Sequence, residues 1–204
     1  MELAYHTRAI RWTPFAIAAV VSTVTVVALR KGSAAKPIEV ISILIASAAG
    51  FALDDSAANV LDAVPVSLLK RRLTRVLYVL GPACCLWAPL VWLQGPASAA
   101  EGWALVAMFA GLLGLAFGFA GVATRRMAPG RGGIAVAPAL LCALIVSTTL
   151  PPRWRPLPLG DIPGGWAAID LRWSTAAMVG SVMFLWSSRD RAGRPAIVGK
   201  EGAS

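Results

Sequence analysis

The sequence contains few charged residues. Only 14% of its 204 residues are charged, whereas 57% are hydrophobic, and the mean hydropathy is +0.69. A soluble domain has about 25% charged residues. Uninterrupted apolar runs of roughly 17–25 residues are instead typical of chains that cross a bilayer. The composition therefore predicts an integral, multi-pass protein of a bacterial plasma membrane and leaves no room for a second sizeable soluble domain.

Residues for several kinds of chemistry are also missing. The single histidine, His6, lies near the N-terminus, and the three cysteines (Cys84, Cys85 and Cys142) lack CxxC spacing, which predicts neither a metal site nor a disulfide. No GxxxxGK[ST] motif is present, so any ATP would be hydrolysed by another chain. No charged residue lies near the centre of an apolar run, although ion-coupled carriers usually need one. We therefore expect neither an enzyme nor a cofactor in this chain.

Long apolar runs predict six transmembrane helices. The expected spans are Trp12–Leu29, Pro37–Leu53, Val76–Leu93, Trp103–Ala123, Ile134–Leu150 and Ser174–Ser187, the last of which could begin near Trp166. Strands are not expected, because membrane strands alternate apolar and polar residues in segments of about 10 residues. The predicted fold class is an all-α membrane protein, with residues 1–187 as a six-helix transmembrane domain and residues 188–204 as a mobile basic tail.

The net charge of +9 is concentrated beside the apolar runs. Cations lie before the first run, between the second and third, between the fourth and fifth, and after the sixth: Arg8, Arg11, Lys70, Arg71, Arg72, Arg75, Arg125, Arg126, Arg131, Arg189, Arg191, Arg194 and Lys200. Cytoplasmic loops are rich in Lys and Arg, so both termini are predicted to be cytoplasmic and nucleic acid is not an expected partner. The loop Arg30–Lys36 does not follow this pattern, because it carries three cations on the predicted outer side.

One charged stretch interrupts the apolar sequence between the second and third runs: FALDDSAANVLDAVPVSLLKRR, Phe51–Arg72. Asp54 or Asp55 is suited to cap a helix, and Pro65 would end that helix. Helical spacing puts Ala57, Leu61, Val64 and Leu68 on one face and Asp55, Asn59 and Asp62 on another. Ser67 can cap the next helix. The stretch predicts a short amphipathic helix at the cytoplasmic surface.

Three interpretations of this short helix are open. It can be an interfacial connector whose basic end touches anionic lipid. It can be a docking helix that passes the motion of a cytoplasmic partner into the membrane. Its acids can also bind a metal or a diphosphate, but no second acidic cluster is present to complete such a site.

Two other patterns concern packing and the outer surface. Gly111, Gly114, Gly118 and Gly121 fall on one helical stripe, which predicts close helix packing within the chain or with another chain. The prolines at 82, 89 and 138 predict kinks. In the segment Pro151–Trp173, Trp154, Trp166 and Trp173 suit an interfacial aromatic belt, and Trp166, Ile169 and Trp173 share a helical face. This outer segment is either an anchor or a partly re-entrant cap.

Together these features resemble an ABC-2-type ABC transporter permease. The topology matches, and ALDDSAANVLDAVPVSLLKRRLTR is similar to the corresponding segment of short actinobacterial permeases. The resemblance implies that Ser56–Ala63 is a coupling helix on a cytoplasmic ABC ATPase, which binds the ATP and Mg. It also implies a second permease subunit, identical or homologous, and export as the direction. The implied contacts with the ATPase are Asp54, Asp55, Asn59, Leu61, Asp62 and Val64.

Two other classes of protein fit the same outline. A substrate-capture subunit of a vitamin importer is also a six-helix chain of about this length. Such subunits usually carry an Ala-x-x-x-Ala pattern on the first helix, which is not clear here. A non-transporting membrane assembly factor or immunity protein is the third possibility.

Overall fold

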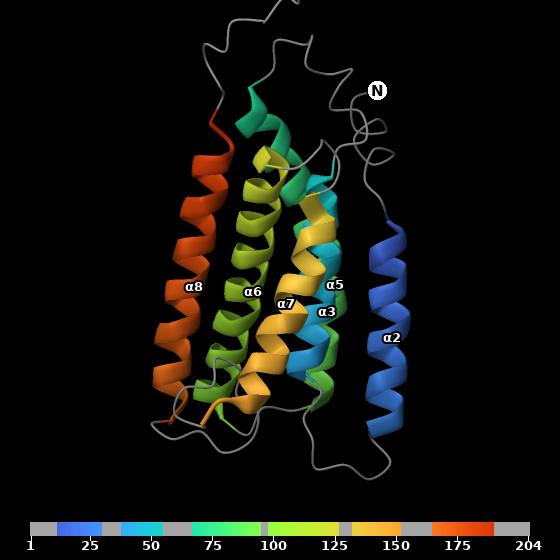
Figure 1. Cartoon of the computed structure of the whole chain (residues 1–204). Coiled ribbons are helices and arrows are strands. Elements are labelled where there is room, and N and C mark those ends of the chain that lie inside the picture. Colours follow the sequence, from blue (N-terminus) through green and yellow to red (C-terminus); the bar gives the residue numbers. More distant parts are fainter. Residues whose placement is uncertain are drawn as a thin grey trace, which may run out of the picture.

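The computed structural model describes residues 12–29, 38–54, 67–94, 98–126, 132–151 and 165–189, and all its regular elements in these ranges are helical. They are α2 (Thr13–Leu29), α3 (Ile38–Gly50), the 3-10 turn η1 (Phe51–Leu53), α5 (Leu68–Gln94), α6 (Ala99–Arg126), α7 (Gly132–Thr149) and α8 (Gly165–Ser187). Successive α-helices run in alternating directions along one bundle (Figure 1). The predicted all-α class is confirmed.

Each predicted apolar run corresponds to one of these helices. The third helix, α5, starts eight residues before the apolar run, at Leu68, because the Ser67 hydroxyl accepts a hydrogen bond from the Lys70 amide at 3.4 Å. This contact is the N-cap that the sequence predicts. The sixth helix has the longer of its two predicted forms and begins at Gly165. Ser98 likewise accepts a hydrogen bond from the Glu101 amide at the start of α6, at 3.1 Å.

Two helices are long and apolar enough to cross a membrane. These are the segments Leu68–Leu93, with 26 residues, and Ala99–Arg126, with 28 residues. At about 1.5 Å per residue, each exceeds the roughly 30 Å of a bilayer's hydrocarbon core. The other apolar helices among the described residues, Thr13–Val27, Ile38–Gly50 and Gly132–Ser147, are shorter. Length and composition thus point to membrane association, on the strength of α5 and α6.

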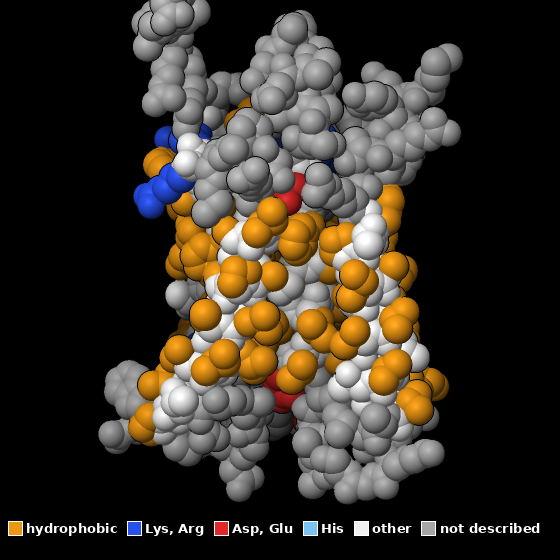
Figure 2. Space-filling model, turned by 45° about the vertical axis from the view of Figure 1, so that its right-hand side comes forward, with side chains coloured by type: hydrophobic (Ala, Val, Ile, Leu, Met, Phe, Trp, Pro, Cys, Tyr) orange, Lys and Arg blue, Asp and Glu red, His pale blue; other side chains and the backbone are white. Residues whose placement is uncertain are grey.

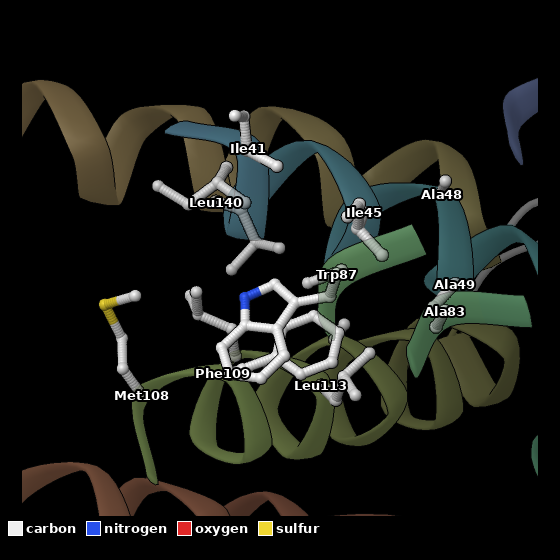
Figure 3. Packing of buried hydrophobic residues seen from close by; sticks show 14 of the residues in the cluster. Ile41, Ile45, Ala48, Ala49, Ala83, Trp87, Met108, Phe109, Leu113 and Leu140 are labelled. Carbon is white, nitrogen blue, oxygen red and sulfur yellow. The ribbon is translucent and has the colours of Figure 1, made fainter. Parts of the chain in front are cut away.

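The core of the bundle is built around α3. Eleven of its 13 residues are buried, and it packs against α2, α5, α6 and α7. Trp87 of α5 joins this core from the side, between Ile45 and Phe109 (Figure 3). Its ring stacks on that of Phe109 at 4.6 Å and 4°, and its indole N–H donates to the Ser42 hydroxyl at 2.9 Å. One side chain therefore ties α5 to both α3 and α6.

The outside of the bundle is strongly apolar. Hydrophobic side chains cover the middle of the face seen in Figure 2, and Lys and Arg side chains appear near its upper end. The helix α2 packs on α3 through Phe15, Ala18 and Val26, whereas Val20 and Val24 on its other faces are more than 60% exposed. Such an exterior requires an apolar environment or a covering partner.

Candidate functional site: the Arg72 end of the bundle

The predicted site residues fall into two groups. The structure describes Asp54, the four glycines of the stripe, Ile169 and Trp173. The remaining predicted coupling residues, Asp55, Asn59, Leu61, Asp62 and Val64, lie outside the described residues, as do Trp154, the side chain of Trp166 and the tail from residue 190. Asp54 lies at the end of the bundle where α3 ends and α5 begins, and several hydrogen-bonded side chains of α5, α6 and α8 lie at the same end.

Asp54 is buried between two helices. Its side chain is only 2% exposed, and its Oδ1 accepts a hydrogen bond from the Gly133 amide at 2.6 Å. The first amides of a helix lack partners within it, and its positive end attracts a carboxylate. Asp54 therefore caps the start of α7 from the end of η1. The sequence predicts Asp54 as a cap of the following helix or as a contact for a partner, and neither prediction anticipates this burial.

The two glycines that open α7 make this contact possible. A Cβ atom on Gly133 would lie 2.6 Å from the Cα of Phe51, and one on Gly132 would lie 2.7 Å from the carbonyl oxygen of Ala120. Cβ atoms do not come so close to other backbone atoms in real proteins. A larger residue at either position would push α7 away from η1 or from α6.

Arg72 joins α5 to the far ends of α6 and α8. Its Nη1 donates to the carbonyl oxygen of Ser187 at 2.9 Å and to the hydroxyl of the same serine at 3.3 Å. Its Nη2 donates to the Thr124 hydroxyl, which in turn donates to the carbonyl of Gly121 at 2.8 Å. Arg72 is buried, so these contacts compensate for the removal of its charge from water.

Arg125 reaches the same helix end from α6. Its Nε donates to the carbonyl oxygen of Ser187 at 2.7 Å, and its Nη2 donates to that of Arg189 at 2.6 Å. The guanidinium also lies over the Trp186 ring, 4.8 Å from the ring centroid. The last carbonyls of a helix lack partners within it and form its negative end, so two arginines from two helices cap α8. We call Arg72, Thr124, Arg125 and Ser187 the arginine clasp.

The four glycines of the predicted stripe lie where α6 crosses α8. A Cβ atom on Gly111 would lie 2.8 Å from the carbonyl oxygen of Trp173, and one on Gly118 would lie 2.7 Å from that of Gly180. Gly114 faces Ala177 and Gly180, and Gly121 faces Ser187. The two helices therefore pack closely from Gly111 to Gly121, over about three turns of α6. We call this contact the glycine seam.

The outer residues Ile169 and Trp173 are buried, with exposed fractions of 5% and 6%. Trp173 packs on Gly111 inside the glycine seam. This placement differs from the interfacial aromatic belt that the sequence favours for Trp173.

Sequence reasoning missed three parts of this region. Gly180 has no second glycine at helical spacing in α8, so no repeated pattern of glycines marks it. Arg72 lies in a run of cations that indicates the cytoplasmic side of a membrane and does not single out one residue. Gly132 and Gly133 precede the fifth apolar run, and their position there is typical of a loop end. Among the described residues, no group of three His, Cys, Asp or Glu side chains is placed to hold a metal ion.

No family model, curated protein sequence or solved structure matches this chain. The fold and the site alone therefore define the class. It is an all-helical bundle with an apolar exterior and a cationic, hydrogen-bonded end.

Proposed function

We propose that this protein is a membrane-spanning permease subunit of an ATP-driven ABC transporter, most simply an exporter. In this proposal all six helices cross a bacterial plasma membrane, and both termini are cytoplasmic. A separate cytoplasmic ABC ATPase supplies the energy, with ATP and Mg bound there, and a second permease subunit, identical or homologous, completes the path. The proposal extends the membrane association indicated by α5 and α6 to the whole bundle.

The observation that carries the proposal is the distribution of charge along the bundle. The alternating helices bring most of the described cations to one end: Lys70, Arg71, Arg72, Arg75, Arg125, Arg126 and Arg189. The other end holds Arg172 together with Glu39, Glu101 and Asp170. An excess of Lys and Arg marks the cytoplasmic side of a membrane protein. The apolar surface between the two ends supports a membrane crossing, whichever end is cytoplasmic.

The short helices are compatible with six crossings. The 13 residues of α3 are almost entirely enclosed by other helices, so its length does not have to match the lipid. Backbone that is buried in protein tolerates irregularity at membrane depth, whereas backbone exposed to lipid does not. Mismatch at α2 and α7 is accommodated by tilt or by local thinning of the bilayer.

Residues 55–66 are the proposed docking segment for the ATPase. The described residue before them, Asp54, is bonded to α7, and Arg72 soon after them is bonded to α6 and α8. A partner that binds the connection between Asp54 and Ser67 would therefore act on four helices through two hydrogen-bonded contacts. A segment with this role suits a transporter better than it suits a simple connector.

The test is purification of the tagged protein from its native membranes, followed by mass spectrometry of the bound chains. We expect an ABC ATPase and a permease chain. The charge reversal D55K/D62K should abolish recovery of the ATPase, whereas D170K, an exposed charge reversal at the opposite end, should leave it unchanged. Equal recovery with D55K/D62K, or no ATPase with the unchanged protein, would overturn the proposal.

A further inference from the structure

The contacts that hold α5 to the α6–α8 pair differ from those that hold the pair together. At the glycine seam, backbone lies against backbone, and the two helices cannot separate without losing that packing along its whole length. At the arginine clasp, a long side chain spans the distance from α5 to Ser187 and Thr124. Such a contact can break and re-form with little change elsewhere.

Few of the residues of α5 are buried by the part of the chain that the structure describes. In the most apolar 18-residue window of α5, 17% of the residues are buried, against 61% in α6. Leu73, Leu77 and Trp92 are between 46% and 80% exposed. In the half from Leu68 to Leu80, the buried residues are Arg72, Arg75 and Val79. A movement of this half therefore disturbs a few positions and the narrow faces that pack on α3 and η1.

The middle of α5 contains a point where the helix bends easily. Pro82 has no amide hydrogen and cannot donate the regular helical bond to the carbonyl of Tyr78. Gly81 before it has open space around its Cβ position, since no described residue outside its own stretch of helix comes within 4 Å. In a helix interior, Gly and Pro cost about 1 and about 3 kcal/mol relative to Ala. This bend point separates the Arg72 contact from the Trp87 contact.

The clasp also holds positive charges close together. The charges of Arg125, Arg71 and Arg75 all act on Arg72. Their repulsion opposes the hydrogen bonds that Arg72 makes, so the net stabilisation by the clasp is smaller than its hydrogen bonds alone would provide. The glycine seam contains no such opposition.

We propose that the arginine clasp is a releasable joint. When Arg72 leaves Ser187 and Thr124, the half of α5 from Leu68 to Leu80 turns away from α8 about Gly81 and Pro82. In this movement α6 and α8 stay together as one body, and Trp87 keeps the other half of α5 on α3. The use of the joint rests on the proposed function, in which its opening on the cytoplasmic side would follow the state of the ATPase.

The test is a pair of spin-label distances in the full chain, with Cys84, Cys85 and Cys142 replaced by Ala, in lipid nanodiscs. Labels at the exposed positions Leu73 and Leu185 report on α5 and α8. Labels at Phe119 and Leu185, also exposed, report on α6 and α8. In R72A we expect the first distance to lengthen by ~2 Å or more, the scale of helix shifts in switching proteins, and to become broader. The second distance should not change.

Two further variants control the result. R126A removes a neighbouring exposed cation and should leave both distances unchanged. R72K keeps a charge but cannot reach Ser187 and Thr124 together, so it should give an intermediate shift even if R72A fails to fold. An unchanged α5–α8 distance in R72K and R72A, or an equal shift of both distances, would overturn the joint.

This measurement uses the isolated chain. A purification that recovers no ATPase would overturn the proposed function and leave the result for the joint unchanged. Conversely, an α5–α8 distance that stays unchanged in R72A and R72K would overturn the joint and would leave the proposed function untouched.

Discussion

The glycine seam and the arginine clasp are two different kinds of contact between helices. Both hold α8 against another helix, and both involve Ser187. The seam removes side chains so that two backbones meet, which gives a rigid contact with many small van der Waals terms. The clasp uses long charged side chains on carbonyl oxygens, which gives a few strong, localised bonds. A protein that must move one helix and keep another fixed needs both kinds of contact.

The largest effect is expected from filling the seam. A Cβ atom on Gly180 would overlap the backbone of Gly114, so G180A should destabilise the protein by about 3 kcal/mol or more. The matched control is G81A, where the Cβ position is open, and this variant should be neutral or gain up to about 1 kcal/mol. Thermal unfolding in a mild detergent measures both. Equal stability of the two variants would mean that the seam is not close-packed.

The next effect is expected at Asp54. D54A removes a charge-assisted hydrogen bond to the first turn of α7, at a cost of about 2 kcal/mol. D54N keeps an oxygen acceptor and should lose less. Hydrogen exchange of residues 132–136 should be faster in D54A than in the unchanged protein. Unaltered exchange there would show that Asp54 does not hold α7.

A smaller effect is expected from Arg125. R125A removes two hydrogen bonds to the end of α8 and the contact with Trp186, but Arg72 still caps Ser187. We expect a loss of about 1.5 kcal/mol, against less than about 0.5 kcal/mol for the exposed R126A. Chemical denaturation of the two variants side by side checks this difference. An equal loss of stability in R125A and R126A would mean that removal of a positive charge, and not loss of the hydrogen bonds of Arg125, causes the effect.

The smallest effect is expected at the centre of the bundle. W87F keeps the stacking on Phe109 but loses the hydrogen bond to Ser42, at a cost of about 1 kcal/mol. Ser42 still donates to the carbonyl of Ile38 at 2.7 Å, so its buried hydroxyl keeps a hydrogen bond. The double variant W87F/S42A should cost less than the sum of the single variants. Strict additivity would indicate that the two side chains do not interact.

The helices themselves are predictable from the sequence because each is a long apolar run. Ser67 as the start of α5 is predictable too, since capping depends on residues three positions apart. The glycine stripe also carries its own signal, and the sequence correctly places those four residues on one face of α6.

The partners of these residues are not predictable in the same way. Whether Gly114 meets Gly180 depends on how far α8 slides along α6, and a single sequence contains no information on that register. Lys70, Arg71 and Arg72 look alike in the sequence, but about 100° of rotation separates successive residues on a helix. Only Arg72 of these three is buried. The contact of Asp54 with α7 is not predictable for a related reason: its hydrogen-bond partner, Gly133, lies 79 residues further along the chain.

The central claim is that this bundle crosses a membrane with the arginine clasp on the cytoplasmic side. It is tested most directly by single cysteines at the exposed positions Ser98 and Arg189, in a chain with Cys84, Cys85 and Cys142 replaced by Ala. Intact cells are treated with a membrane-impermeant maleimide. We expect S98C to be labelled in intact cells and R189C only after the cells are permeabilised. Labelling of R189C in intact cells would contradict the account.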